Sequence, residues 1–442
     1  MNRQAIIGLG VTGYSLLKFL AREGATNLVV VDTREHPPML EAAQRDFAQV
    51  EYVCGRSSRY MAWHDVTRVH VSPGVALDSC LLAIPTRLGI PMDSDIGIFL
   101  RNAQAPVFAV TGTNGKSTVC SLAAHLMRAV GVRVGLGGNL GHPALDLLSE
   151  LAPLYLLELS SFQLERLAGE SVHMGAILNV APDHADRYKS FDEYRSAKLR
   201  IAQDAEVSLE NRQDPLTATS SARMRLSFGL DAPVGERDGG ILDGDWLSVG
   251  AHRVGQVKQL QLMGKHGCAN ALAALVLANE AGADLIQAAE HLSSFNGLAH
   301  RSQLVGVYDG VRWIDDSKAT NLAAALATVD GLSLSASEGG LVWILGGDAK
   351  GVDLAPLKQA IGPEVRGICV MGKDAERFSE AVDEATEVLR AETMGEAVYL
   401  CSKLARSGDT VLLSPAAASL DMFEDYQARG RAFASAVDSL KS

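Results

Sequence analysis

Residues 108–119 read FAVTGTNGKSTV, and residues 5–13 read AIIGLGVTG. In each stretch a strand-like apolar run breaks into a glycine-rich turn and continues into a helix-like pattern, which is the local order of an α/β fold. Glycines in such a turn let a phosphate group approach the backbone N–H groups at the start of the helix. The chain therefore contains two candidate phosphate-binding loops, one near its N-terminus and one in its central part.

The overall composition is that of an ordinary globular protein. Of the 442 residues, 47% are hydrophobic and 21% are charged, and this length accommodates roughly three domains. No apolar stretch approaches the ~18 residues of a membrane span. The opening residues, MNRQAIIGLG, lead directly into a glycine loop and not into a small-residue cleavage site. We therefore expect a cytoplasmic protein with no membrane insertion.

Charge and cysteine content argue against two further classes. A formal net charge of −12 argues against nucleic acid as a partner, because binding a polyanion depends on many basic contacts to phosphates. The six cysteines form no C-x-x-C pair and no zinc-type spacing. We expect reduced, mostly buried thiols without a functional role.

Three α/β units follow one another along the chain. The first alternates strand-like runs, such as NLVVVD, with helix-like stretches up to about residue 92, and the same pattern resumes at 107 with VFAV. Residues 203–262 are polar and rich in turns, with short strands between them, which indicates an insertion or lid on the second unit. The third unit opens with a predicted hairpin, LVGVYDGVRWID, whose turn is Asp309–Gly310.

The N-terminal loop has the spacing of a dinucleotide-binding fingerprint. Gly8, Gly10 and Gly13 follow AII in the order G-x-G-x-x-G, and Asp32 ends the next strand-like run, 19 residues after Gly13. An acid at that position can accept hydrogen bonds from ribose hydroxyls. From these residues alone, NAD, another nucleotide diphosphate and a purely structural turn all remain open.

The central loop carries a more specific pattern. TGTNGKST places Lys116, Ser117 and Thr118 at the start of a predicted helix. Phosphates are bound by backbone N–H groups and an ammonium group, and a hydroxyl can share Mg²⁺. The loop is shorter than the G-x-x-x-x-G-K-[ST] loop, because only two residues separate Gly112 from Gly115. The pattern predicts a site for a nucleoside triphosphate.

Polar residues follow three later strand-like runs. Asn139 follows VRVGLGG, Glu158 lies in LYLLELSS, and Asp183-His184 follows AILNV. Because the carboxyl ends of parallel strands meet at one crevice, these side chains predict one or two Mg²⁺ ions beside the triphosphate. Each of them alone also has a structural interpretation, as a paired buried acid or as a loop histidine.

Lys198 lies on the apolar side of a predicted helix. In FDEYRSAKLRIA it is four residues after Tyr194 and three before Ile201. Burial would lower the pKa of its amine and make the neutral form reactive, so that it could add CO₂ and become a carbamate, an oxygen ligand for metal. The pattern alone favours the commoner arrangement, in which the stem covers apolar surface and the charged head reaches water.

Together these motifs resemble those of the Mur ligase superfamily. The resemblance covers nearly the whole chain in order: GLGVTG, VDTRE, VSPGVAL, TGTNGKST, GGNLG, LELSSFQLE, ILNVAPDHADRY, YRSAKLRI, HRSQ, WIDDSKATN, LGGDAKG and LLSPAAASLD. TGTNGKST is shared across the superfamily, including the folylpolyglutamate synthases. GLGVTG with VDTRE, SSFQLE, DHADRY and SPAAASLD is typical of the members that add D-glutamate.

The resemblance implies an α/β protein of three domains. A Rossmann-like domain for the UDP substrate would span 1–92, a P-loop ATPase-like domain with a β-rich insertion would span 93–298, and a C-terminal Rossmann-like domain contacting D-glutamate and ATP would span 299–442. Hinges near residues 92 and 298 would let the domains close and exclude water from a reactive intermediate.

The activity implied by the resemblance is an ATP-dependent ligation. D-glutamate would be joined to UDP-N-acetylmuramoyl-L-alanine through an acyl phosphate and a tetrahedral intermediate, giving ADP and phosphate, in peptidoglycan precursor synthesis. The partners would be these small molecules, the cofactors would be ATP, two Mg²⁺ ions and a CO₂-derived carbamate on Lys198, and the chain would act as a monomer.

The resemblance also implies the residues of each site. ATP would be bound by Gly112, Thr113, Asn114, Gly115, Lys116, Ser117, Thr118, Asn270, Arg301, Asp316 and Lys318. The UDP substrate would be bound by Gly10, Val11, Thr12, Asp32, Thr33, Arg34, Gly74, Asn139 and Ser160. D-glutamate would contact Thr320, Lys350, Ser419 and Tyr426. Metal would be held by Ser117, Glu158, His184 and Lys198, and the catalytic set would be Lys116, Asn139, His184, Lys198, Arg301 and Lys318.

The chain differs from related ligases at one position of a motif, and three other functions remain as alternatives. Gly267 occupies a position in GKHGCAN where related ligases often have asparagine. An NAD oxidoreductase would leave TGTNGKST without a role, and a regulatory P-loop NTPase would leave the N-terminal loop without one. Another Mur enzyme or a folylpolyglutamate synthase would differ in the amino acid that it adds.

Overall fold

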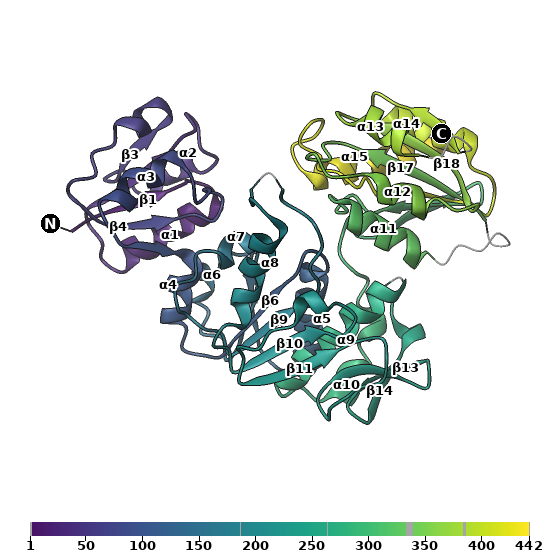
Figure 1. Ribbon diagram of the computed structural model, residues 1–442, viewed down its shortest axis with the longest axis horizontal. Helices are drawn as coiled ribbons and strands as arrows, with labels where there is room; N and C mark the ends of the chain where they lie inside the picture. The colour runs from purple at the N-terminus through teal and green to yellow at the C-terminus, as the bar shows by residue number, and fades with distance from the viewer. Residues whose placement is uncertain (1, 186, 263, 333–338, 383–385, 442) are drawn as a thin grey trace.

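The protein is built from three α/β bodies, each around its own sheet. The computed structural model describes residues 2–185, 187–262, 264–332, 339–382 and 386–441. Figure 1 shows the N-terminal body in purple, the central body in blue to green below it, and the C-terminal body in green to yellow on the other side. Among these described residues, none of the helices combines the length and apolar character needed to cross a bilayer.

The N-terminal body is a five-stranded parallel sheet in the order β3-β2-β1-β4-β5. Its strands are β1 Arg3–Ile7, β2 Leu28–Asp32, β3 Glu51–Cys54, β4 Val66–Val71 and β5 Met92–Ser94. Its helices are α1 Val11–Arg22, α2 Leu40–Asp46 and α3 Cys80–Arg87. The expected division at residue 92 therefore falls inside β5, the edge strand of this sheet.

The N-terminal and central bodies share one hydrophobic core. Apolar residues of β1 and α1 pack in the same cluster as those of α4 Asp95–Asn102, α6 Ala144–Leu147 and the central sheet. Lys18 and Ser15 of α1 also reach Asp146 of α6, at 2.9 and 2.7 Å. In this structure the two bodies therefore pack directly against each other.

The central body is a nine-stranded sheet in the order β14-β13-β12-β11-β10-β9-β6-β8-β7. Its strands are β6 Val107–Thr111, β7 Gly135–Gly138, β8 Tyr155–Glu158, β9 Met174–Ile177, β10 Val207–Asn211, β11 Met224–Phe228, β12 Gly239–Leu242, β13 Trp246–Val249 and β14 His252–Gln256. Its other helices are α5 Lys116–Ala129, α7 Ser161–Leu164, α8 Phe191–Leu199, α9 Gly264–Glu280 and α10 Leu285–Ala289, and α5 and α9 pack together over one face.

The turn-rich segment at 203–262 is β-rich, as expected, but it does not form a separate lid. β10 pairs in parallel with β9 along Val207–Glu210, and β11 continues the sheet in parallel with β10. The antiparallel strands β12, β13 and β14 then close this edge. The segment is thus an extension of the central sheet, since β10 pairs directly with β9 and the later strands follow in order from β10.

The C-terminal body is a six-stranded sheet in the order β15-β16-β20-β17-β18-β19. Its strands are β15 Gln303–Tyr308, β16 Val311–Asp315, β17 Leu341–Gly346, β18 Val365–Met371, β19 Glu387–Arg390 and β20 Thr410–Leu413. β15 and β16 form the predicted hairpin, and both Asp309 and Gly310 have positive φ, at 51° and 76°. Two consecutive residues with positive φ are the geometry of a type I′ turn, which confirms that prediction.

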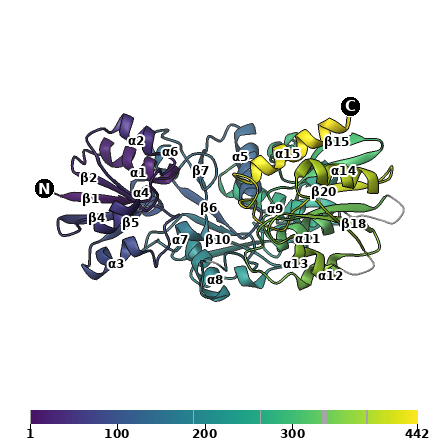
Figure 2. The same ribbon diagram turned by 90° about the horizontal axis from the view of Figure 1, so that it is seen from above.

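Helices cover both faces of this last sheet. One core cluster contains side chains of α11 Leu322–Gly331, α12 Ala355–Ala360 and α13 Ala375–Ala381, and another contains those of α14 Met394–Leu404 and α15 Tyr426–Asp438. Figure 2 shows α14 and α15 on the opposite side of the strands from α12 and α13.

The cysteines are all free thiols, as expected. Cys120, Cys369 and Cys401 are buried, whereas Cys54 and Cys268 are half-buried and Cys80 is exposed.

Candidate functional site

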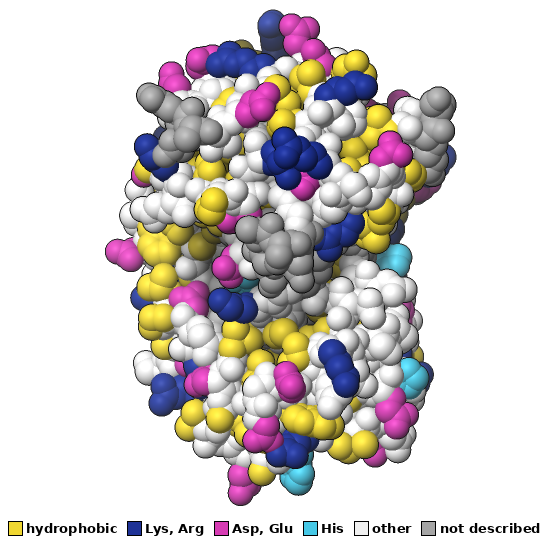
Figure 3. Space-filling view, turned by 90° about the vertical axis from the view of Figure 1, so that its right-hand side faces the viewer, with side chains coloured by type: hydrophobic (Ala, Val, Ile, Leu, Met, Phe, Trp, Pro, Cys, Tyr) yellow, Lys and Arg dark blue, Asp and Glu magenta, His cyan; other side chains and the backbone are white. Residues whose placement is uncertain are grey.

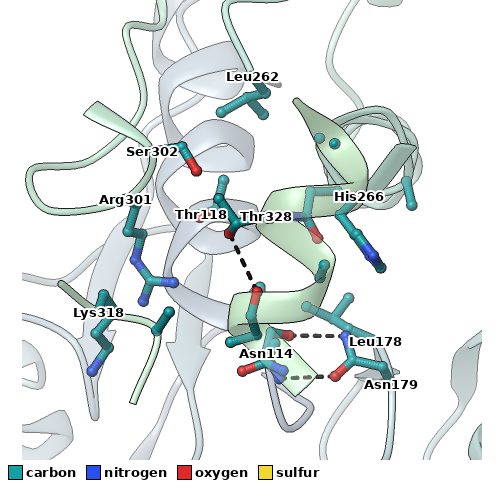
Figure 4. Close-up of a pocket in the computed structure, with 18 of the residues that line it drawn as sticks. Asn114, Thr118, Leu178, Asn179, Leu262, His266, Arg301, Ser302, Lys318 and Thr328 are labelled. Carbon is teal, nitrogen blue, oxygen red and sulfur yellow. Dashed lines mark hydrogen bonds between the residues drawn. The ribbon is translucent and has the colours of Figure 1, made fainter. Parts of the chain in front are cut away.

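The central glycine loop joins β6 to α5 and is held from the neighbouring strand. The backbone N–H of Asn114 donates to Asn179 Oδ1 at 2.8 Å, and Asn179 Nδ2 donates to the Asn114 carbonyl at 3.0 Å (Figure 4). The Thr113 N–H also donates to the carbonyl of Asn179. Asn179 follows β9 as Glu158 ends β8, but the sequence analysis did not single it out.

The end of the loop is left-handed and closely packed. Gly115 has a φ of 84° and precedes α5 with no side-chain cap. A Cβ at Gly115 would lie 2.6 Å from Oδ1 of Asn270, which belongs to α9. The loop therefore leaves the first N–H groups of α5 available to a ligand, and Asn270 lies against the loop.

Two lysines converge on one carbonyl oxygen of this loop. Lys116 Nζ donates to the carbonyls of Gly112 and Thr113 at 2.8 and 2.9 Å, and Lys198 Nζ donates to that of Gly112 at 2.8 Å. Lys198 is buried, with its Nζ 4.5 Å from the ring centre of Tyr194. Burial, reinforced by the charge of Lys116, holds the pKa of Lys198 well below its ordinary value, and burial also lowers the pKa of Lys116.

The carboxylate at the end of β8 is only partly satisfied. Glu158 is buried, and its Oε1 accepts a hydrogen bond from Asn139 Nδ2 at 2.9 Å. Its Oε2 is buried without a hydrogen-bond partner among the described residues. A buried carboxylate oxygen without a partner is costly unless a cation or a donor completes it.

Asp183 and His184 lie beyond β9 on the same side of the sheet. His184 has a φ of 53°, and its N–H donates to Asp183 Oδ1 at 2.8 Å. The His184 ring packs against Phe162 and Tyr194, with ring centres 4.8 and 6.0 Å apart. This packing and the backbone turn fix the imidazole beside Tyr194, whose ring also contacts the buried Lys198.

These donors suit Mg²⁺ only in part as they stand. In the described part of the chain, no three His, Cys, Asp or Glu side chains are grouped as a metal site. The unpartnered oxygen of Glu158 and the Ser117 hydroxyl fit one ion that also takes phosphate oxygens, since Mg²⁺ is commonly bound by one or two carboxylates plus substrate phosphates. An unmodified Lys198 offers only N–H donors, so a site using it with His184 needs an oxygen on that amine.

The C-terminal body brings cations to the same loop. Arg301 Nη2 donates to Ser117 Oγ at 2.9 Å, across the junction with the central body. Lys318 Nζ lies 4.1 Å from the ring centre of Tyr426. Burial, together with the charges of Arg301 and Lys116, lowers the pKa of Lys318 to about 8. Three cationic side chains thus lie around the start of α5.

Asp316 anchors this side of the site. Its carboxylate accepts hydrogen bonds from the Ser302 N–H at 3.0 Å, Thr328 Oγ1 at 2.7 Å and Ser414 Oγ at 2.8 Å. Burial raises the pKa of Asp316 to about 6, against the opposing effect of these hydrogen bonds. The carboxylate ties the segment after β16 to α11 and β20 and also lines the cavity described next.

A cavity of about 480 Å³ lies between the central and C-terminal bodies. Its polar end includes the loop residues Asn114, Gly115 and Thr118 with Arg301 and Lys318, and its apolar walls include Leu178, Leu262, Phe228 and Ala323 (Figure 4). Figure 3 shows the junction of the two bodies as a hollowed band across this face. A cationic end and an apolar slot suit a nucleoside triphosphate.

Gly267 has a packing role in this cavity. A Cβ at Gly267 would lie 2.8 Å from the backbone carbon of Leu262. The absent side chain lets the segment before α9 lie directly against the first turn of the helix, and Leu262 lines the cavity there. Where related ligases often have asparagine, this chain has Gly267, and the apolar side chain of Leu262 lines the cavity beside it.

The N-terminal loop is preorganised around Asp32. Its buried carboxylate accepts hydrogen bonds from the Leu9 N–H at 2.7 Å and from the Arg34 side chain at 2.9 and 2.7 Å. Burial raises the pKa of Asp32, but the hydrogen bonds from Arg34 and Leu9 outweigh it and the net pKa is lowered. Asp32 therefore fixes the loop and orients Arg34, whose side chain remains half exposed.

The backbone of the same loop is open to a ligand. Gly10 precedes α1 without a side-chain cap, and a Cβ at Gly13 would lie 1.9 Å from the Gly8 carbonyl oxygen. Close packing of α1 on β1 thus requires glycine at 13. Val11 and Thr33 are exposed and Thr12 is half-buried at this end of the sheet.

Two arginines connect this region to the central body. Arg187 Nη2 donates to the carbonyls of Pro73 and Val75, each at 3.2 Å, and pairs with Glu165. Arg166 donates to the same Val75 carbonyl. These bonds tie Pro73 and Val75, on either side of Gly74, to Arg187 and to Arg166, which lies just after α7. Ser160 is the N-cap of α7. Neither arginine was predicted as a site residue from the sequence, although Arg187 lies within the DHADRY motif.

The four residues expected around D-glutamate lie in the C-terminal body. Tyr426 begins α15 beside Lys318, and the Thr320 N–H donates to the Lys318 carbonyl at 2.8 Å. Lys350 and Ser419 are brought near each other because Asp348 and Ala418 exchange backbone hydrogen bonds at 3.0 and 2.9 Å. No hydrogen bond joins the Lys350 and Tyr426 side chains in the described residues.

Comparison with known proteins gives matches over almost the whole chain. Three family models match: "Mur ligase MurD-like, N-terminal domain" at residues 2–93, "Mur ligase middle domain" at 110–278 and "Mur ligase, glutamate ligase domain" at 300–417. A UDP-N-acetylmuramoylalanine–D-glutamate ligase of Pseudomonas putida is 42% identical, with coverage of 98% of this chain and 97% of the relative.

Solved structures are similar in fold. A UDP-N-acetylmuramate-alanine ligase of Thermotoga maritima superposes with a TM-score of 0.63 at 18% identity and covers 100% of both chains. A MurF ligase of Thermotoga maritima in complex with ADP superposes with a TM-score of 0.61 at 15% identity and covers 99% of this chain and 96% of its own.

Proposed function

The chain belongs to the Mur ligase family, and on that premise we propose that it joins D-glutamate to UDP-N-acetylmuramoyl-L-alanine at the expense of ATP. It is an amide-bond-forming ligase of peptidoglycan precursor synthesis. The observation that carries this proposal is the cavity at the central loop, which Arg301 and Lys318 of the C-terminal body line beside the loop residues Asn114 and Gly115. Lys116 follows these two loop residues and donates to the loop carbonyls.

ATP activates the carboxylate so that an amide bond can form. A carboxylate does not react readily with an amine, because its leaving group would be oxide. Transfer of the γ-phosphoryl group to the alanyl carboxylate breaks the bond to ADP and forms an acyl phosphate. The amine of D-glutamate then attacks the acyl carbon, and the tetrahedral intermediate releases inorganic phosphate and a proton.

The protein contributes positioning and charge. Lys116, Arg301 and Lys318 neutralise the phosphates and hold the γ-phosphoryl group toward the acceptor, which is the main requirement in phosphoryl transfer. Asn139 is held by Glu158 and orients the muramyl carboxylate. Closing of the cavity between two bodies excludes water from the acyl phosphate.

Family membership implies ATP and Mg²⁺, and the residues present fit one ion as they stand and a second ion once Lys198 carries an oxygen. Ser117 and Glu158 would hold one ion, and His184 with a carbamylated Lys198 would hold a second. When bound, these ions supply charge neutralisation at the phosphate oxygens.

Carbamylation of Lys198 is supported by its surroundings. The amine is buried and lies near the charge of Lys116, and both effects hold its pKa low and favour the neutral nucleophile. Its lone pair would attack the carbon of CO₂, and loss of one N–H proton would leave an anionic carbamate. The carbamate supplies the oxygen that the unmodified side chain lacks.

The proposal also assigns the UDP substrate to the N-terminal body and D-glutamate to the C-terminal body. The N-terminal loop would bind the diphosphate of the UDP substrate through Thr12 and the N–H groups at the start of α1, with Asp32, Thr33 and Arg34 near the uracil. Thr320, Lys350, Ser419 and Tyr426 would receive D-glutamate. The proposal includes three domains at 1–92, 93–298 and 299–442, with hinges near residues 92 and 298. It also includes a monomeric enzyme in the cytoplasm.

The decisive experiment measures Mg²⁺-dependent phosphate release from ATP with UDP-N-acetylmuramoyl-L-alanine present. D-glutamate, L-glutamate, meso-diaminopimelate, L-lysine and no amino acid are compared, and the product mass is measured. Release only with D-glutamate, with the expected product, supports the proposal. Release without an amino acid would favour a regulatory NTPase, and release with another amino acid would favour a different ligase.

A further inference from the structure

Asn321 makes contacts on both sides of the junction between the central and C-terminal bodies. It is the N-cap of α11, and its Oδ1 accepts a hydrogen bond from the Ala324 N–H at 2.8 Å. Its Nδ2 donates to Asp183 Oδ2 at 3.0 Å and to Asn114 Oδ1 at 3.3 Å, both in the central body. The side chain is buried, with 8% exposure. One amide therefore caps a helix of one body and bridges two residues of the other.

The two residues that it bridges belong to separate parts of the site. Asn114 lies in the central glycine loop and is itself held by Asn179. Asp183 directly precedes His184 and accepts the N–H of that residue. An amide N–H₂ has two donors, so Asn321 can satisfy both acceptors together only when the loop and the Asp183 turn are in the correct relative position.

The other end of α11 also lies against the central body. A Cβ at Gly264, the first residue of α9, would lie 2.3 Å from the Cα of Gly331, the last residue of α11. Figure 1 shows α11 on the side of the C-terminal body that faces the central body. The helix is therefore docked at its C-terminal end by backbone contact and at its N-terminal end by a polar bridge.

We propose that Asn321 is a positioning residue that couples the docking of α11 to the arrangement of the triphosphate loop and the Asp183–His184 turn. It touches no substrate. It acts by holding Asn114 and Asp183 in one arrangement when the C-terminal body is docked, and it releases them when that body moves away. Its effect on catalysis rests on the proposed function, whereas its effect on docking does not.

The test separates the bridge from the helix cap. Asn321→Ser keeps an oxygen that can cap α11 but removes the amide donors, and Asn321→Asp keeps the cap and places a carboxylate opposite Asp183. Thr393→Ala is the matched control, because Thr393 caps α14 of the same body through a 3.2 Å bond from the Glu396 N–H and lies in another helix. Asn321→Ala removes both cap and bridge.

The expected result is a split between turnover and stability. Asn321→Ser should lower kcat about tenfold, the effect of a lost hydrogen bond to a charged group, with the KM for the UDP substrate and the melting temperature near wild type. Asn321→Asp should lose about a hundredfold, because like charges face each other. Thr393→Ala should lose stability and keep kcat. Wild-type kcat in Asn321→Ser would overturn the proposal.

A double-mutant cycle tests the route of the effect. If Asn321 acts through Asp183, the Asp183→Asn/Asn321→Ser double variant should be no slower than the slower single variant, since contacting residues are not additive. Additive losses would overturn the coupling.

Small-angle scattering with Mg²⁺ and ADP gives a readout that does not depend on ligase activity. Asn321→Asp should have a larger radius of gyration than wild type, and Thr393→Ala should match wild type. An unchanged radius in Asn321→Asp would overturn the docking role even if ligation by wild type is found. Expansion of Asn321→Asp without D-glutamate ligation by wild type would instead support the docking role and contradict the proposed function.

Discussion

Lys116 and Lys198 donate hydrogen bonds to the same carbonyl oxygen, that of Gly112, each at 2.8 Å. Two ammonium groups at one buried acceptor repel each other, and the more deeply buried amine is the one whose neutral form is favoured. Under the proposed function, this geometry would let Lys116 face a phosphate as the charged form while Lys198, from α8, reacts with CO₂ as the neutral form.

Replacement of Lys198 by alanine should therefore lower kcat by on the order of a hundredfold or more, because the site loses an oxygen ligand and its charge. Formate, acetate or bicarbonate at millimolar concentration should partly restore turnover by placing an anionic oxygen in the vacated space. Steady-state rates with and without added carboxylate provide the measurement. Lys189→Ala, an exposed lysine just before α8, is the control. Full activity of Lys198→Ala would contradict the carbamate.

The left-handed glycine before α5 leads to a second prediction. Gly115→Ala places a Cβ 2.6 Å from Asn270 Oδ1 at a φ of 84°, whereas Gly131→Ala, beyond the other end of the same helix, meets open space at a φ of 82°. Both variants should lose about 1 kcal/mol of stability from the backbone conformation. Only Gly115→Ala should also raise the KM for ATP, by about tenfold or more, since the loop must shift. Equal KM values for the two variants would contradict a phosphate-binding loop.

The order of strands and helices could be predicted from local patterns, whereas the pairing of strands remote in sequence could not. The Asp309–Gly310 hairpin and the strand–loop–helix units depend on residues close in sequence, and the structure confirms them. The segment at 203–262 shows polar turns and short strands, but nothing local says that Val207–Asn211 pairs with Met174–Ile177. Sheet membership there depends on a partner remote in sequence.

The same distinction applies to the site. Lys116, Glu158 and His184 stand next to recognisable strand ends and could be identified from sequence. Asn179 and Asn321 act through partners distant in sequence, namely the loop residue Asn114 and the acid Asp183. Such roles can be identified only in the folded structure, because a single asparagine has no recognisable local sequence pattern.

We expect Lys318 to make nucleotide binding depend on pH. Its pKa is about 8 in the free protein, and the phosphates of ATP favour its charged form. Binding should therefore be strongest below pH 8, and the Kd for ATP should rise by up to about tenfold per pH unit above it, because a proton must then be taken up. Equilibrium titration from pH 6.5 to 9.5 measures this slope. Lys318→Arg, which stays charged throughout, should give a flat profile, and an equal slope in both proteins would assign the titration to another group.

The last prediction concerns the arginine beneath the Ser317–Lys318 segment. Arg429 is buried in α15, and its guanidinium donates to Ser317 Oγ at 2.9 Å, to the Ser317 carbonyl at 2.8 Å and to the Ala417 carbonyl at 3.0 Å. Burial lowers its pKa to about 10. Arg429→Met removes three donors at once and leaves buried acceptors without partners.

Arg429→Met should therefore lose about 3 kcal/mol of stability, and urea unfolding followed by tryptophan fluorescence measures it, because Trp313 and Trp343 are buried in this body. Arg431→Ala, an exposed position in the same helix, should change stability by less than about 0.5 kcal/mol. Since Ser317 precedes Lys318, the Arg429 variant should also bind ATP more weakly under conditions where it remains folded. A stable variant with normal ATP affinity would show that the surrounding backbone holds Lys318 in place without the guanidinium.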